Sequence, residues 1–174
     1  MVLFTWAISL YNRLVANRNR VKESWSGIDV SLKKRYDLVP NLVETVKGYA
    51  RHEQDTLAKV TSYRTASVNA TTPEQKAEAA TGLTRALGSL FAVAENYPDL
   101  KANSTFLQLQ TELANIENSL ESARRYYNGT VRENNNLVES FPSNVIAGMF
   151  GFKTSPFFET EDNTHRETPK VTFS

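Results

Sequence analysis

Apolar residues recur at helical spacing along most of the chain, and this pattern predicts four long helices. The first apolar stripe advances in steps of seven, four, three and four residues, a rhythm typical of helices that pack side by side. It comprises Leu14, Val21, Trp25, Ile28 and Leu32. The second stripe comprises Val39, Val43, Val46, Ala50, Leu57 and Val60. The helix that carries the second stripe is expected to end near Ser67.

The first two helices are expected to meet in the segment 36–40. Asp37 is of a residue type that caps helix N-termini, and Pro40 fits the first turn of a new helix because it has no N–H to donate. The second apolar stripe starts directly beside it, at Val39. The sequence therefore predicts that the chain reverses direction here.

The later helices carry clear boundary signals. Thr72, Pro73 and Gln75 have the pattern of a capping box with proline in the first helical position. The third helix is expected to end at Pro98, and the fourth to reach about Asn136. The third stripe comprises Leu83, Leu87, Leu90, Ala94 and Tyr97. The fourth comprises Phe106, Leu109, Leu113, Ile116, Leu120, Ala123 and Tyr127.

Four helices with short connections predict an all-α fold, an antiparallel up-and-down four-helix bundle. We expect the bundle to cover residues 12–140, after an apolar N-terminal segment, 1–11, and before a C-terminal extension with a mobile tail, 141–174. If the first two helices each hold about 25 residues, three residues should share one level midway along the bundle. These are Trp25, Glu53 and Ala86.

The ten residues from Val2 to Tyr11 are uncharged and largely apolar. A helix that crosses a bilayer needs about 20 such residues. Three interpretations remain: the end of a membrane anchor whose first half is absent, an interfacial anchor, or the start of an ordinary apolar helix. Residues 1–36 carry seven basic and two acidic side chains, a balance of +5 that leaves −4 for the rest. Such a basic segment is expected on the cytoplasmic side of an anchor, or as a solvated face.

Aromatic residues are densest near the C-terminus, at Phe141, Phe150, Phe152, Phe157 and Phe158. The antiparallel topology places this Phe-rich extension beside the apolar N-terminus. It is either a surface that docks on a membrane or a partner, or a flap that covers the open base of the bundle.

Composition removes several classes of function. The 174 residues include no cysteine, which excludes disulfides and thiolate metal sites. The net charge of +1 argues against a nucleic-acid-binding protein, since these usually carry a strong basic excess.

The sequence offers no catalytic, cofactor-binding or metal-binding residues, and we predict that the chain is not an enzyme. His52 and Glu53 begin like a zinc-protease motif, but position 56 is Thr56 where a second histidine is required. Neither His52 nor His165 is part of a Glu-x-x-His pair of the kind that binds di-iron in bundles. No phosphate-binding loop and no nucleophile elbow is present.

Charged residues interrupt the apolar stripes, with Arg18 and Arg35 in the first and Glu53 in the second. They are either an internal ligand site, together with Glu117, or a polar layer that fixes helix register; the second interpretation is favoured. The cluster Lys33-Lys34-Arg35 is expected to be a solvated face rather than a lipid contact. Three glycosylation sequons are expected to be coincidental: those that begin at Asn69, Asn103 and Asn128.

Two blocks of sequence resemble the LemA family of bacterial proteins. The first includes Trp25-Ser26, Ile28-Asp29-Val30 and the nearly continuous run from Arg35 to Ala50, DLVPNLVETVKGYA being its most specific part. The second includes Tyr97-Pro98-Asp99-Leu100-Lys101-Ala102, Glu117-Asn118, Tyr127-Asn128, Phe141-Pro142 and the pair Phe150/Phe152. The resemblance implies a helical bundle behind a single N-terminal transmembrane helix ahead of Tyr11. It implies no catalytic residue, because the biochemical activity of the family is not established.

These expectations favour a membrane-associated scaffold or adaptor on the cytoplasmic side of the bacterial cell membrane, single-pass or peripheral. The N-terminal segment would contact membrane lipid, and the bundle would bind a protein partner or further copies of itself, but not nucleic acid. The alternative is a small-molecule or ion sensor that uses a polar layer of Arg18, Glu53 and Glu117 in mid-bundle. A cavity of about 300 Å³ or more lined by these residues would support the sensor.

Overall fold

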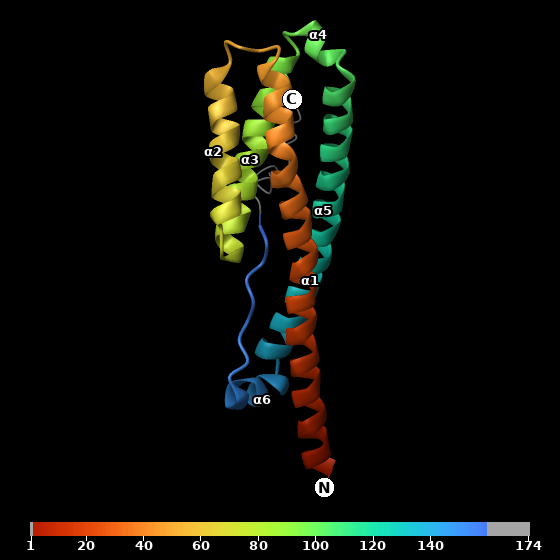
Figure 1. Cartoon of the computed structure of the whole chain (residues 1–174). Coiled ribbons are helices and arrows are strands. Elements are labelled where there is room, and N and C mark those ends of the chain that lie inside the picture. The colour runs from red at the N-terminus through yellow and green to blue at the C-terminus, as the bar shows by residue number, and fades with distance from the viewer. Residues whose placement is uncertain (1, 160–174) are drawn as a thin grey trace, which may run out of the picture.

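The computed structural model describes residues 2–159, and the regular secondary structure in that range is all helical (Figure 1). The all-α prediction is thus confirmed. The helices are α1 (Val2–Lys47), α2 (Gln54–Asn69), α3 (Pro73–Ala94), α4 (Pro98–Lys101), α5 (Ser104–Glu139) and α6 (Ser143–Phe150). The tail from residue 160, including His165, lies outside the described residues, as does its predicted mobility.

The prediction of a chain reversal at residues 36–40 is wrong, because α1 continues through Pro40 to Lys47. A proline inside a helix leaves the carbonyl four residues earlier without its N–H partner. That carbonyl belongs to Tyr36, and it accepts a hydrogen bond of 3.4 Å from Nε of Arg64 on α2. A side chain from the neighbouring helix therefore supplies the donor that Pro40 lacks. The buried positions also continue in helical register across the proline, from Val39 to Val43 and Val46.

The chain instead reverses after Lys47, in the turn 48–53. The turn begins where the amides of Tyr49 and Ala50 both donate to the carbonyl of Val46. As a result α1 has 46 residues and α2 only 16, rather than about 25 each. The predicted common level of Trp25, Glu53 and Ala86 is wrong for the same reason, because Glu53 lies at the end of the molecule, in this turn.

The two shorter helices, α2 and α3, lie beside only one half of the long helices (Figure 1). The predicted capping box at the start of α3 is confirmed: the Thr72 hydroxyl accepts from the Gln75 amide, and the Gln75 side chain accepts from the Thr72 amide. The helices α2 and α3 approach each other closely at Gly82 of α3, where an added Cβ atom would lie 2.2 Å from the ring of Tyr63 on α2. Pro98 does not simply end α3, which stops at Ala94, but begins the short helix α4.

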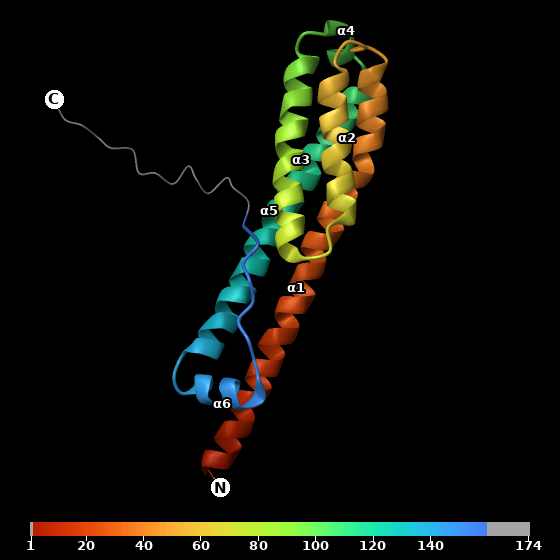
Figure 2. The ribbon, with the colours of Figure 1, turned by 90° about the vertical axis from the view of Figure 1, so that its left-hand side faces the viewer.

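The long helices α1 and α5 run in opposite directions and form the shaft of the molecule (Figures 1 and 2). Small residues line their contact: the buried hydroxyls of Ser24 and Thr130 are hydrogen-bonded at 2.8 Å, and a Cβ atom on Gly27 would lie 3.6 Å from that of Ala123. The shaft carries three successive apolar clusters. They centre on Val46 and Leu90 where α2 and α3 pack, on Ile28 and Val131 near mid-shaft, and on Leu14 at the lower end; only the first two include residues of α3.

The C-terminal region closes the lower part of the shaft. After α5 the chain turns at Pro142 into α6, which lies across the shaft, and residues 152–159 then run back up between α1 and α5 (Figure 2). We call residues 152–159 the strap. It has no helical or strand hydrogen bonds of its own, so the side chains of α5 and α1 hold it in place.

Candidate functional site

The first turns of α1 and the helix α6 lie together at the lower end of the shaft (Figure 1), and both carry exposed large apolar side chains. Exposed fractions reach 70% for Phe4, 73% for Met149 and 83% for Phe141. This apolar end comprises Phe4, Trp6, Ile8 and Tyr11 from α1 with Phe141, Val145, Met149 and Phe150 from the C-terminal region. Soluble monomers rarely expose so many neighbouring large apolar groups, so this end is the first candidate for a functional surface.

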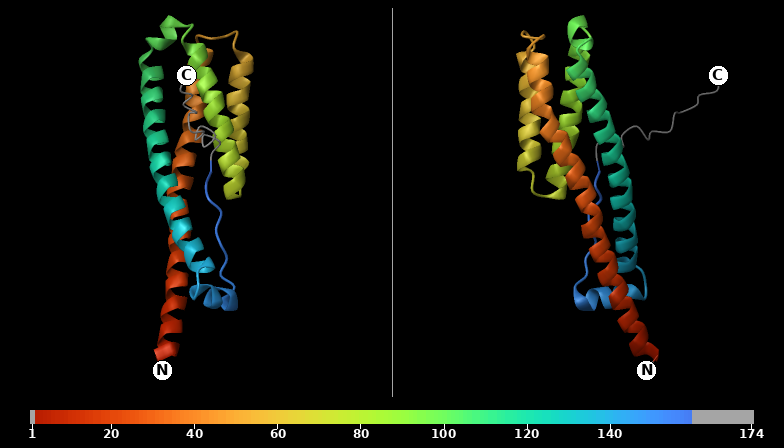
Figure 3. Two further views of the ribbon diagram at one scale, coloured as in Figure 1. Left: turned by 180° about the vertical axis from the view of Figure 1, so that it is seen from behind. Right: turned by 45° about the vertical axis from the view of Figure 1, so that its right-hand side comes forward.

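The apolar end is fixed by a small core directly behind it. Leu14 on α1 packs with Ala147 on α6 and with Phe152 of the strap, all three buried. Gly151 ends α6 in the left-handed conformation, φ 69°, and the Phe152 amide donates to the Ala147 carbonyl at 2.9 Å. Figure 3 shows the result from two further sides: α6 lies across the shaft and the first turns of α1 extend beyond it.

The sequence-based expectation that residues 145–158 lie beside the N-terminus is correct for α6 and the start of the strap, but not for Phe158, which packs on Trp25 near mid-shaft. The ring of Tyr11 stands edge-on to Phe150, with ring centroids 4.8 Å apart, and to Phe152, at 5.7 Å. The flap interpretation is correct for part of the Phe-rich extension, and the docking interpretation stays a prediction. Phe152 and Phe158 are buried and cover the shaft, whereas Phe141 and Phe150 are exposed at its end.

No helix within residues 2–159 combines the length and the apolar character that a membrane crossing requires. Basic side chains border the apolar end instead. Arg13, Arg18 and Lys22 are exposed on α1, and no acidic residue precedes Glu23. The guanidinium of Arg18 also lies over the ring of Phe152, 5.2 Å from its centroid, in a cation–π contact.

A second polar feature lies inside the bundle, around Arg35. The cluster Lys33-Lys34-Arg35 is not a uniform face: Lys33 and Lys34 are exposed, whereas Arg35 is only 2% exposed. Its guanidinium donates to the Ala80 carbonyl at 3.1 Å and to the Thr84 hydroxyl at 2.7 Å, both on α3. Its Nε lies 2.6 Å from a carboxylate oxygen of Glu117 on α5. One side chain thus joins three helices.

The ion pair between Arg35 and Glu117 is held at a cost. Burial raises the pKa of the Glu117 carboxyl above its ordinary value, and the nearby guanidinium offsets this only in part. Burial likewise lowers the pKa of Arg35, again against the attraction of Glu117. Taking both charges out of water opposes the charged state of each, which is common for ion pairs of this kind.

The polar layer predicted for a sensor does not form. Arg18 contacts the strap near the lower end, Glu53 accepts a hydrogen bond of 3.3 Å from the Tyr97 hydroxyl at the opposite end, and Glu117 pairs with Arg35 between them. The predicted reversal at residues 36–40 would place these residues at one level, but the chain reverses at residues 48–53 and separates them along the shaft. The space beside Arg35 measures about 10 Å³, far below the 300 Å³ expected of a ligand site.

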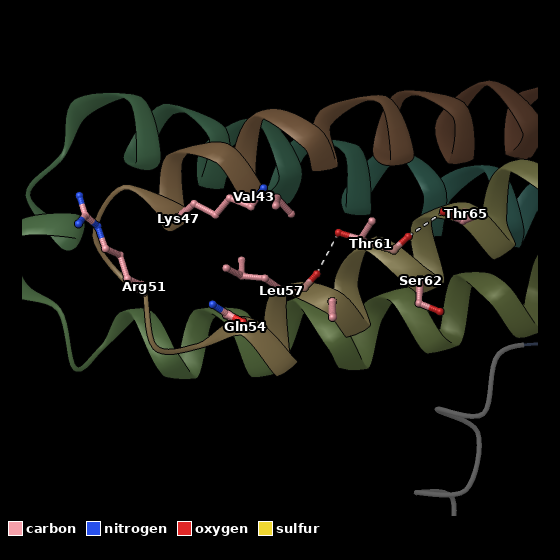
Figure 4. Close-up of a pocket in the computed structure, with 10 residues that line it drawn as sticks. Val43, Lys47, Arg51, Gln54, Leu57, Thr61, Ser62 and Thr65 are labelled. Atoms are coloured by element: carbon pink, nitrogen blue, oxygen red, sulfur yellow. Dashed lines mark hydrogen bonds between the residues drawn. The ribbon is translucent and has the colours of Figure 1, made fainter.

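An open groove of about 850 Å³ lies between the end of α1 and α2 (Figure 4). Val43 and Leu57 supply its apolar floor, and Lys47 and Arg51 supply positive charge at one end. Lys47 is already paired with Glu44, at 2.9 Å. The hydroxyls of Thr61 and Thr65 donate to carbonyls of their own helix, drawn as dashed lines in Figure 4. The groove has no buried polar group directed at a ligand.

No group of three or more metal-ligating side chains occurs in the part of the chain that the structure describes. His52 is exposed in the turn after α1. The neighbouring Glu53 is occupied by Tyr97, and partial burial together with that carboxylate raises the pKa of the Tyr97 hydroxyl.

Three asparagines on α5 have a role that the sequence patterns above did not predict. Asn128 and Asn135 bind the main chain of the strap, and Asn134 donates to the Lys153 carbonyl at 3.4 Å. The signal available in the sequence is the run Asn134-Asn135-Asn136, because asparagine is a poor helix former that is unusual in succession within a helix. Two predicted sequons have structural roles as well: Asn103 caps α5, and the Asn128 amide is engaged by the strap.

Comparison with known proteins agrees with the resemblance seen in the sequence. The model of the LemA family matches residues 24–173. Protein LemA of Metamycoplasma hominis is 27% identical over 155 residues, which cover 87% of this chain and 69% of that protein. Magnetosome protein MamQ 2 of Paramagnetospirillum magneticum is 25% identical over 188 aligned positions, covering 93% of this chain and 68% of that protein. Magnetosome protein MamQ of Magnetospirillum gryphiswaldense is 23% identical, covering 99% and 72%.

Proposed function

The chain belongs to the LemA family, and from this premise we propose that it is a non-enzymatic scaffold that docks on the bacterial cell membrane through its apolar end. The observation that carries the proposal is the joint exposure of aromatic and aliphatic side chains from α1 and α6 at one end of the shaft. Because segments more than 130 residues apart in sequence contribute to it, this surface is a product of the fold. Burying it against lipid would remove a large apolar area from water.

The geometry of the apolar end suits a bilayer surface. A short helix lying across the shaft, as α6 does, can rest in the interfacial plane with its apolar side chains toward the acyl chains. The first turns of α1 extend past it (Figure 1). From Tyr11 to Val2 a helix rises by about 14 Å, roughly half of an apolar core about 30 Å thick. The described residues therefore support peripheral docking with a shallow insertion.

Charge supports the same orientation. The basic residues Arg13, Arg18 and Lys22 follow directly behind the apolar turns of α1, at the level where lipid head groups would lie. Each basic residue near an anionic leaflet contributes about 1 kcal/mol of attraction. A basic segment beside a membrane insertion is typical of the cytoplasmic side. We therefore propose that the shaft extends into the cytoplasm and that its side faces bind a protein partner or further copies of the chain.

We expect the paired substitution Met149→Glu/Phe150→Glu to weaken binding of the full chain to vesicles of phosphatidylcholine and phosphatidylglycerol by at least about 30-fold. Two exposed apolar side chains are removed and two charges are placed where lipid is expected, at a combined cost of more than about 2 kcal/mol. Co-sedimentation measures the bound fraction. Leu107→Glu is the matched control, because Leu107 is an exposed apolar residue of α5 near the opposite end. Equal sedimentation of the two variants would refute docking through the apolar end.

A further inference from the structure

The strap is held to α5 by two asparagines that each bind both main-chain groups of one residue. Asn128 accepts from the Phe158 amide at 2.9 Å and donates to the Phe158 carbonyl at 3.1 Å. Asn135 accepts from the Ser155 amide at 2.8 Å and donates to the Ser155 carbonyl at 3.0 Å. A carboxamide is suited to this because it offers a donor and an acceptor side by side. These hydrogen bonds reach only main-chain atoms of the bound residue, so they do not depend on its side chain.

The spacing of the two asparagines matches the repeat of an extended chain. Seven residues along a helix span about 10.5 Å. Three residues of extended chain span about 10 Å. Asn128 and Asn135 are seven residues apart, and the residues that they bind, Phe158 and Ser155, are three apart and run in the opposite direction. This face of α5 is therefore built to receive an antiparallel extended segment.

The Tyr127 hydroxyl also donates to the Pro156 carbonyl at 2.9 Å, and two aromatic side chains of the strap supply its apolar contacts. Phe158 is 1% exposed and stands edge-on to Trp25, with ring centroids 5.7 Å apart. Phe152 is buried against Tyr11 and under the guanidinium of Arg18. Lys153, Thr154, Pro156 and Phe157 lie between them and are exposed. Main-chain hydrogen bonds combined with alternate side-chain anchors are the usual way in which proteins bind extended peptides.

We propose that the face of α5 around Asn128 and Asn135, with the facing side of α1, is a peptide-binding site for an extended segment that carries two aromatic residues six positions apart. Its occupant in self-association is the segment 152–158 of a second copy of this chain. That segment is identical to the resident strap, so an exchange between two copies conserves every contact described above. The strap is joined to α5 only through α6 and a short turn, which makes α6 the connection that has to swing.

Concentration decides which copy fills the site. A tethered segment has an effective concentration in the millimolar range, so the resident strap prevails in dilute solution. Docking on a membrane brings copies together and favours exchange. The inference therefore deepens the proposed function and in that sense rests on it. Its experiment is done without lipid, so that failure of one proposal is distinguishable from failure of the other.

The experiment uses two complementary full-length copies. The first carries Asn128→Ala and Asn135→Ala, which disable its site and leave its strap intact, with a donor dye on Thr154→Cys. The second carries Phe158→Ala, which weakens its strap and leaves its site intact, with an acceptor dye on Glu139→Cys. The chain has no cysteine of its own, so each label is unique. Thr154 and Glu139 are both exposed.

We expect energy transfer in the mixture that rises with concentration and that weakens at least about tenfold when Asn128→Ala and Asn135→Ala are also placed in the acceptor copy. Asn136→Ala in the acceptor copy is the control and should change nothing, because Asn136 is an exposed neighbour on α5. Circular dichroism verifies that each copy is helical; if the alanine pair lowers helicity, Asn128→Asp and Asn135→Asp replace it, since they keep the acceptor and remove the donor. Absence of energy transfer, or transfer that survives loss of both asparagines in the acceptor copy, would overturn the proposal.

Discussion

Replacing Arg35 with alanine is expected to lower the free energy of unfolding by about 3–5 kcal/mol, the largest effect of any single substitution that we predict. The side chain is 2% exposed, so its loss leaves a cavity where α1, α3 and α5 meet. It also leaves the Glu117 carboxylate, 39% exposed, without its cation. Urea denaturation followed by circular dichroism measures the loss. A decrease below about 1 kcal/mol would show that the three-helix junction contributes little.

The pH dependence of stability at this junction distinguishes the effect of the Arg35 charge from the effect of its side-chain volume. Arg35→Met keeps most of the volume but removes the offsetting charge, so the pKa of Glu117 is expected to rise further above its ordinary value of 4.5. An acid whose pKa is raised by folding destabilises the folded state when it is ionised. The deficit of Arg35→Met should therefore be complete above the raised pKa and shrink as the pH falls toward 4.5. Adding Glu117→Leu should abolish this pH dependence and recover most of the stability.

Replacing Trp25 with alanine is expected to lower the free energy of unfolding by about 3 kcal/mol, at the lower end of the range for buried aromatic residues because the ring is only half-buried. Trp25 stands edge-on to Tyr127, with centroids 5.2 Å apart, and to Phe158 of the strap. Its loss removes contacts on α5 and on the strap together.

Thermal unfolding measures the effect, with Trp25→Phe as a control that keeps an aromatic ring and should lose about 1 kcal/mol. An unchanged melting temperature in Trp25→Ala would show that the ring contributes no packing. A loss in stability without any increase in strap mobility would show that the packing of Phe158 does not depend on its contact with Trp25.

Local signals in the sequence predicted local structure well. The capping box at Thr72, the start of α3 at Pro73 and the uninterrupted stripe of α5 depend on neighbours within one helical turn, and the structure has them as predicted. Pro40 failed as a signal because its cost is offset from elsewhere: the donor that satisfies Tyr36 comes from Arg64, 28 residues along the chain. Sequence patterns within one or two helical turns cannot predict a hydrogen bond between residues so far apart.

The polar sites likewise depend on contacts between residues that are distant in sequence. Arg35 and its two neighbours Lys33 and Lys34 look alike in sequence, yet only Arg35 is buried, because its position on α1 faces α3 and α5. The asparagines of α5 acquire a role only when the chain returns past them as the strap. The apolar end was predicted in part, because antiparallel topology alone brings the Phe-rich extension back to the N-terminus.

The fluorescence of Trp6 reports whether the apolar end enters lipid. The chain has two tryptophans, so Trp25→Phe leaves Trp6 as the single reporter at that end. Mixed with vesicles of phosphatidylcholine and phosphatidylglycerol that carry brominated acyl chains, this variant should show a blue-shifted emission and strong quenching, because an indole at the edge of the bilayer lies within reach of the bromines. Emission that neither shifts nor is quenched, at lipid concentrations where the chain sediments with the vesicles, would show that another surface makes the contact and would contradict docking through the apolar end.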